Sequence, residues 1–109
     1  MNISGGRAKV YAFIQDVPIG EDVYRRIMEK IGPEPIAGSL VHLCVREADG
    51  RLRYIDVWES EEACTRAFEE RIHPGVDAAF GGIRPAQEPA VHRLDVLHAT
   101  GALLETSWA

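Results

Sequence analysis

Residues 54–63 constrain the fold most, because they read as a strand that runs directly into a helix. Ile55 and Val57 are β-branched and alternate with other side chains, which is the period of a pleated strand with two distinct faces. Ser60 then stands where an N-cap belongs, and the two glutamates after it place negative charge at the positive end of a helix. The stretch therefore predicts a strand–helix junction with Trp58 and a carboxylate at its mouth, a common location for a small-molecule pocket.

The order of the predicted elements defines the fold class. Strands are predicted at residues 9–14, 39–47, 51–58 and 91–99, and helices at residues 21–31 and 60–71. The order strand, helix, strand, strand, helix, strand is the ferredoxin-like βαββαβ arrangement, an α+β fold with a four-stranded antiparallel sheet and two helices on one face. A chain of 109 residues suits one such domain.

We assign residues 8–99 to this domain and residues 1–7 to a flexible leader. Residues 100–109 follow as a C-terminal arm, either packed on a partner subunit or disordered. Within the domain, Gly32 and Pro33 end the first helix, and Pro74 is expected to break or kink the second helix at His73. A short helical piece at residues 76–80 is expected to follow.

Both faces of the predicted sheet carry apolar side chains. In the second strand, Val41, Leu43 and Val45 alternate with Leu40 and Cys44, so neither face is polar. Helices cover one face, and a second copy of the sheet is the simplest cover for the other face. The sequence therefore predicts a symmetric homodimer.

Composition excludes several classes of partner. The net charge is −5, and no cluster of lysines and arginines suggests binding to nucleic acid or to an anionic membrane. No apolar run is long enough for a membrane span, and the N-terminus lacks the apolar core of a signal peptide, so we expect a cytoplasmic protein. Cys44 and Cys64 have no metal-binding or disulfide spacing around them and are expected to be reduced.

The chain resembles a known family at several positions. The pattern Trp58, Ser60, Glu62, Ala63 and the position of His73 resemble the dimeric α/β-barrel superfamily, and within it the antibiotic-biosynthesis monooxygenase-like domains. The resemblance covers roughly residues 8–99. It implies two subunits that pack sheet against sheet into a barrel, each with a cavity between its own sheet and helices, and in some members oxygenation without a cofactor.

Two subfamilies match less well. Haem-degrading members of the superfamily pair an asparagine on the first strand with a Trp and a His, whereas the first strand here offers Tyr11 and Phe13. Polyketide cyclases of this fold place a Tyr and a catalytic His around a His-Pro pair, whereas this chain has Glu70 and Val76 there. Haem binding or degradation is therefore a third, less favoured alternative, and the expected function uses no cofactor.

Strand alternation indicates which residues form a site. Tyr54, Asp56 and Trp58 share one face of the third strand, and His42 lies on the matching face of the second. If these faces point toward the helices, the four side chains line one cavity, with His73 at its mouth. We predict His42 or His73 as a base and Asp56 as its orienting partner, as the catalytic residues. The predicted substrate-binding residues are Tyr54, Trp58, Tyr24 and Phe68.

The predicted chemistry is proton abstraction from an aromatic or polyketide-like substrate. The anion so formed would react with oxygen directly, as in a cofactor-independent monooxygenase, or would rearrange, as in a cyclase or isomerase. The alternative function is a non-catalytic dimeric protein that binds a small organic ligand. An enzyme needs a histidine within hydrogen-bond reach of Asp56 or of the ligand, whereas a binding protein needs only the apolar pocket.

Each site residue also has a structural alternative. Trp58 and Tyr24 can be core residues, and Asp56 can form a salt bridge to Arg53, to Arg93 or to an arginine of the second subunit. His42 can be a hydrogen-bonded wall residue, and His73 can cap a helix. A metal site is not predicted, because His92 and His98 share a strand face but lack an obvious carboxylate partner.

Overall fold

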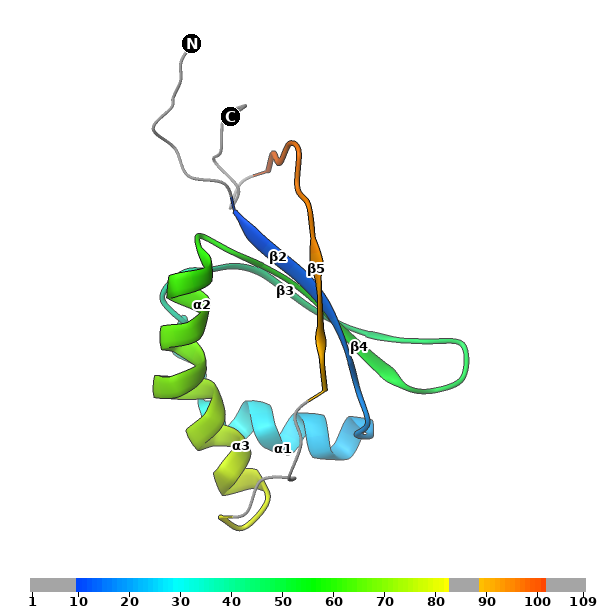
Figure 1. Ribbon diagram of the computed structural model, residues 1–109. Helices are drawn as coiled ribbons and strands as arrows, with labels where there is room; N and C mark the ends of the chain where they lie inside the picture. Colours follow the sequence, from blue (N-terminus) through cyan, green and yellow to red (C-terminus); the bar gives the residue numbers. More distant parts are fainter. Residues whose placement is uncertain (1–9, 83–88, 102–109) are drawn as a thin grey trace.

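The computed structural model describes residues 10–82 and 89–101 (Figure 1). Its strands are β2 (Tyr11–Val17), β3 (Ser39–Arg46), β4 (Leu52–Trp58) and β5 (Val91–Leu94), and its first helix is α1 (Glu21–Ile31). The second helical segment consists of α2 (Glu61–Ala67), the π-helix η1 (Phe68–Ile72) and α3 (His73–Ala79). The strands form one antiparallel sheet in the order β3-β4-β2-β5. The predicted α+β ferredoxin-like fold is therefore confirmed, whereas the leader and residues 102–109 of the arm lie outside the described residues.

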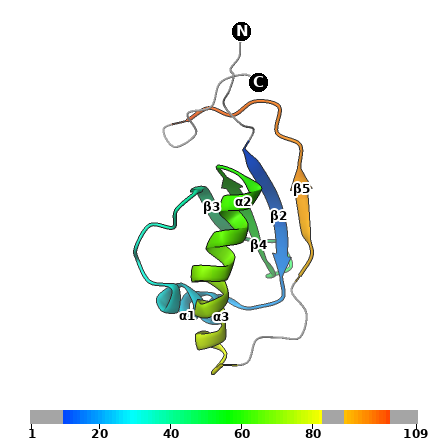
Figure 2. The ribbon, with the colours of Figure 1, turned by 60° about the vertical axis from the view of Figure 1, so that its left-hand side comes forward.

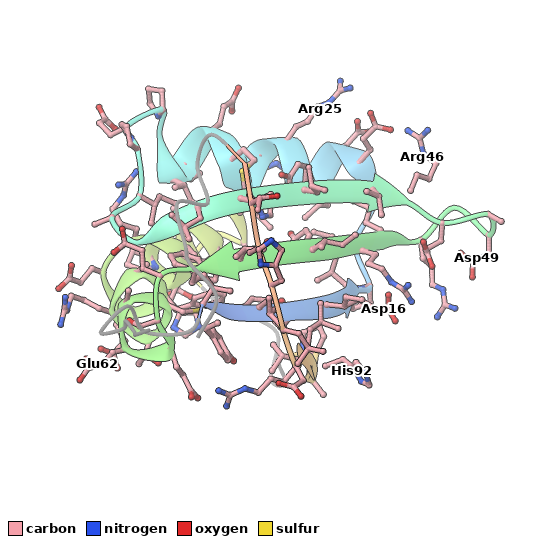
Figure 3. The ribbon with its side chains drawn as sticks, turned by 90° about the horizontal axis from the view of Figure 1, so that it is seen from above. Asp16, Arg25, Arg46, Asp49, Glu62 and His92 are labelled. Carbon is pink, nitrogen blue, oxygen red and sulfur yellow. The ribbon has the colours of Figure 1, made fainter. Side chains whose placement is uncertain are left out.

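The helices lie on one side of the sheet, as Figures 1 and 2 both show. Figure 3 shows β3, β4 and β2 side by side, with Asp49 at the tip of the β3–β4 hairpin and His92 on β5 at the edge of the sheet. Phe13, Trp58, Cys64 and Ala67 form the buried core between the sheet and the second helical segment. Cys44 and Cys64 are free cysteines, as expected for reduced thiols.

The first and last strands in sequence differ in length from the prediction. β2 continues past Ile14 to Val17, because Asp16 and Val17 still pair with β4, and Pro18 follows, which cannot donate to the sheet. β5 ends at Leu94 and not at residue 99. Leu94 pairs with Ala12 near the start of β2, so the residues after Leu94 have little of β2 left to pair with.

The second helical segment changes character before Pro74, where a break or kink at His73 was predicted, and it continues through the proline as α3. Ser60 caps it as expected, since its hydroxyl accepts a hydrogen bond from the Ala63 N–H at 3.0 Å. The π-helical turn η1 then precedes Pro74, and the His73 N–H donates to the Phe68 carbonyl five residues back. The wider turn accommodates the proline, which has no N–H and whose ring crowds the preceding turn of an α-helix. His73 therefore ends η1 and begins α3, so it lies within a continuous helical segment.

The two faces of the sheet have different surroundings. Phe13, Tyr54, Asp56 and Trp58 point toward the helices, and the residues that alternate with them along β2 and β4 point the other way. This outer face carries apolar side chains from three strands: Ile14, Val41, Leu43, Ile55 and Val57. Leu43 is 48% exposed at this face.

Candidate functional site

A cavity of about 320 Å³ lies between the sheet and the helices. Most of its wall is apolar, from α1, the following loop and the second helical segment: Ile27, Met28, Ile31, Ile36, Phe68, Ile72, Val76 and Phe80. The sheet contributes most of the polar lining, namely Gln15, Ser39, His42, Tyr54 and Asp56, and α3 adds His73. An apolar pocket with a few convergent polar groups is the usual form of a small-molecule site.

A chain of three hydrogen-bonded side chains lies at the sheet wall of this cavity. Asp56 is 4% exposed, and its Oδ1 lies 2.6 Å from Nδ1 of His42. The Tyr24 hydroxyl on α1 lies 2.8 Å from Nε2 of the same imidazole. His42 and Asp56 are directly opposite each other in the β3–β4 ladder, so the sheet register positions the pair.

Asp56 is paired with a histidine and not with an arginine. Arg53 contacts Asp16 and Glu47, and Arg93 contacts Glu61, so the predicted salt bridges from Asp56 to Arg53 and Arg93 are wrong. A salt bridge from Asp56 to an arginine of a second subunit stays a prediction. A buried carboxylate needs hydrogen bonds to offset the loss of water, and the imidazole supplies one of them. The structure therefore contains the contact that an enzyme would need here, a histidine within hydrogen-bond distance of Asp56.

Tyr24 occupies a different place from the one predicted. It is absent from the cavity wall and stands behind His42, with its ring 5.7 Å from that of Tyr54 between centroids. Burial raises the pKa of the Tyr24 phenol to about 12 and also raises the pKa of Tyr54. Both phenols therefore stay protonated at neutral pH, and Tyr24 can donate to His42.

The remaining predicted residues form another part of the cavity lining. Trp58, Phe68 and His73 all line the cavity, and their rings form a row. The ring centroids of Trp58 and Phe68 are 6.2 Å apart, and those of Phe68 and His73 are 5.6 Å apart. The edge-on packing of Phe68 and His73 orients both rings. Within the described residues, Nε1 of the buried Trp58 has no hydrogen-bond partner.

Two residues that the sequence analysis did not single out hold the cavity together. Arg71 donates from its guanidinium to the carbonyls of Ile31, Glu34 and Pro35, so it ties the loop after α1 to η1. Gln15 donates to the Pro89 carbonyl at 2.7 Å, which joins β2 to the chain that enters β5. Both contacts link residues far apart in sequence, and no local pattern indicates them.

Across residues 10–82 and 89–101, no group of three or more His, Cys, Asp or Glu side chains is arranged to hold a metal ion. His92 lies on β5, and His98 lies beyond the end of that strand. The helices in this part of the chain are all too short or too polar to cross a membrane.

The chain is therefore a ferredoxin-like domain with an apolar, partly aromatic cavity between its sheet and its helices. No family model matches the sequence, and no curated protein matches it. Solved structures that share the fold include a protein assigned to the antibiotic biosynthesis monooxygenases from Chloroflexus aurantiacus, with a TM-score of 0.60 and 14% identity over 85% of this chain and 98% of the other. They also include SnoaB, a cofactor-independent oxygenase from Streptomyces nogalater, with a TM-score of 0.52 and 20% identity over 85% of this chain and 97% of the other. These neighbours confirm the resemblance as one of fold.

Proposed function

We propose that this chain is an enzyme that removes a proton from a compact aromatic or enolisable substrate inside the cavity. The observation that carries the proposal is the buried Asp56 carboxylate, hydrogen-bonded to His42 at 2.6 Å in the wall of an apolar pocket. Perturbed or coupled acid–base pairs in clefts are typical of catalytic sites. A pocket that only bound an apolar ligand would not need a desolvated carboxylate, so the pair favours catalysis over the binding alternative.

The proposed reaction is oxygenation without a cofactor. The enzyme takes a proton from the substrate, and the resulting anion combines with molecular oxygen, one electron at a time, to give a peroxide. Reprotonation and loss of water leave a carbonyl where the substrate had two hydrogens, so substrate and oxygen give quinone or ketone and water. The cofactor-independent oxygenase among the structural neighbours supports this choice. Isomerisation or cyclisation starts from the same proton removal and is the related alternative.

The cavity size narrows the substrate class. Its volume of about 320 Å³ lies at the lower end of the range for ligand pockets, which is roughly 300–1,000 Å³. A substrate of one or two rings fits this space better than an extended polycyclic polyketide. The aromatic rings of Trp58, Tyr54 and Phe68 offer it flat stacking surfaces.

The proposed assembly is a homodimer that pairs two outer sheet faces. Each sheet leaves apolar residues of three strands uncovered, and a two-fold axis would bring the same surface of a second copy against them. The free thiols of Cys44 and Cys64 fit the reducing cytoplasm, where we propose that the protein works.

The test is turnover of a panel of one- and two-ring phenols, hydroquinones and enolisable ketones. Oxygen uptake is followed with an electrode, and products are identified by mass spectrometry. We expect uptake matched by an oxygenated product, and we expect Asp56→Asn to lower the rate about 10²–10⁴-fold, the contribution of a general base. Asp16→Asn, an exposed carboxylate on the same sheet, is the control. Binding without any conversion would instead support the non-catalytic alternative.

A further inference from the structure

His42 has no ring nitrogen left for a ligand in the cavity. Nδ1 lies 2.6 Å from Asp56, and Nε2 lies 2.8 Å from the Tyr24 hydroxyl. This holds for the Nδ1–H tautomer and for the imidazolium, because the carboxylate accepts from Nδ1–H and the tyrosine hydroxyl can either donate to Nε2 or accept from Nε2–H. A histidine in this position cannot take a proton from a substrate without first breaking one of these two bonds.

Asp56 has the opposite arrangement. Its bond to His42 uses Oδ1, which leaves Oδ2 as the carboxylate oxygen not engaged by His42, on a side chain that lines the cavity. A carboxylate with one oxygen held by a donor has a fixed orientation, so the other oxygen can be presented to a substrate in a defined direction.

We infer that Asp56 is the catalytic base of the proposed reaction, with His42 and Tyr24 as positioning residues behind it. This rests on the proposed function and reverses the roles predicted from sequence. The substrate O–H or C–H proton moves to Oδ2 of Asp56, and the electron pair stays on the substrate. His42 keeps its bond to Oδ1, and Tyr24 holds the imidazole ring from the side away from the cavity. The proton on Oδ2 later returns to the peroxide anion, which regenerates the carboxylate.

The charge of Asp56 supplies a test that does not need turnover. A negative group next to a bound phenol disfavours the phenolate, so the site should select the neutral form of the ligand. The titratable groups packed around Asp56 come from five elements: Tyr24, His42, Cys44, Tyr54, Cys64 and His73. Burial raises the pKa values of the tyrosine and cysteine groups in this set, so these groups stay protonated near neutral pH.

The probe is 4-nitrophenol, whose phenol and phenolate forms absorb at different wavelengths and interconvert near neutral pH. For the wild-type chain we expect the bound probe to favour phenol over phenolate by about tenfold relative to free probe, which corresponds to one pKa unit. Asp56→Asn, which keeps the shape and an oxygen acceptor for His42, is expected to abolish this preference. His42→Gln and Tyr24→Phe leave the carboxylate in place and are expected to lower the preference by less than about threefold.

Matched controls are His92→Gln on β5 and Asp16→Asn on β2, both exposed and outside the cavity lining. Neither is expected to change the preference. If His42→Gln abolishes the preference and Asp56→Asn keeps it, the assignment of the base to Asp56 is wrong, although the cavity still binds a phenol. If the wild-type chain binds no probe, the proposed function itself fails, so the two failures are distinguishable.

A second measurement uses the unaltered protein and so does not depend on the folding of any variant. The nitrogen NMR shift of His42 Nε2 is recorded with and without 4-nitrophenol. We expect the shift to stay unchanged, because Nε2 contacts Tyr24 and not the ligand. A large change on binding would place the ligand on His42 and overturn the inference.

Discussion

Asp56 is the residue whose environment most needs an explanation, because carboxylates are rarely buried in an apolar wall without several donors. Asp56 accepts a hydrogen bond from His42, which lies directly opposite it in the β3–β4 ladder, and Tyr24 on α1 contacts the other ring nitrogen of His42. A structural role alone would be served as well by an apolar pair of similar size, which often stabilises a core more than a buried polar pair does. The carboxylate is therefore best explained by a use in the cavity.

Trp58 gives a prediction at the residue scale. It is 2% exposed, and its Nε1 has no hydrogen-bond partner within the described residues. Trp58→Phe should therefore lose packing but no hydrogen bond, and we expect the free energy of unfolding to fall by about 1–2 kcal/mol, below the roughly 3–5 kcal/mol typical of truncating a buried aromatic to alanine. Urea denaturation measures the change. A loss as large as that of Trp58→Ala would mean that the indole N–H makes a stabilising contact.

The sequence could predict the part of the site that lies on β4 and on its hairpin partner β3. Alternation places Tyr54, Asp56 and Trp58 on one face whatever the tertiary structure, and the hairpin at Asp49–Gly50 brings His42 opposite Asp56. The position of Tyr24 behind His42 depends on how α1 crosses the sheet, which no local pattern encodes. The roles of Arg71 and Gln15 were missed for the same reason, since their partners lie on distant segments.

At the scale of elements, the π-helical turn was the main feature that sequence reasoning missed. Pro74 normally ends a helix, and a wider turn that accommodates it has no sequence signature of its own. The turn has a consequence for the site, because η1 and α3 together direct Phe68, Ile72 and His73 into the cavity. π-helical turns are frequent at functional sites.

The contact between α1 and α3 gives a prediction at this scale. A Cβ at Gly75 would lie 2.4 Å from Cγ1 of Ile31 and 3.2 Å from its backbone nitrogen, so the helices approach as closely as they do because this residue is glycine. Gly75→Ala is expected to destabilise the fold by about 1–3 kcal/mol, as overpacking does. Thermal unfolding measures the loss.

Gly20→Ala is the matched control, since its new Cβ would meet nothing within 4 Å. The control is expected to change stability much less than Gly75→Ala. Ile31 lines the cavity, so Gly75→Ala should also weaken the binding of 4-nitrophenol. Equal stability of the two variants would contradict the close helix contact.

At the scale of the whole molecule, the outer sheet face predicts the oligomeric state. Leu43 lies on that face, 48% exposed in the single chain. We expect light scattering to give a mass of two chains of 12.1 kDa at micromolar concentration, and we expect Leu43→Glu to give one chain with the fold unchanged. Thr65→Glu on the exposed side of α2 is the control. A wild-type protein that stays at the mass of one chain would contradict the dimer.

The buried phenols and thiols predict the response of the whole fold to alkaline pH. Burial raises the pKa of Cys64 from its ordinary value of 9.0 to about 12, and that of Tyr24 from 10.0 to about 12. Between these values the unfolded chain has lost protons that the folded chain still holds, so the free energy of unfolding must fall as pH rises. Urea denaturation across this window should show the fall, and Tyr24→Phe should make it shallower. A constant stability from about pH 8 to about pH 11 would contradict the burial of these groups.

The most direct test of the central claim is hydrogen–deuterium exchange of an enolisable two-ring ketone, 2-tetralone, in deuterated buffer without oxygen. Proton removal is then the only step measured, by NMR of the methylene next to the carbonyl. The proposed enzyme is expected to accelerate this exchange over buffer, and Asp56→Asn is expected to reduce the acceleration by about 10²–10⁴-fold. Exchange at the buffer rate with the wild-type protein, or at the wild-type rate with Asp56→Asn, would contradict proton removal by Asp56 in this cavity.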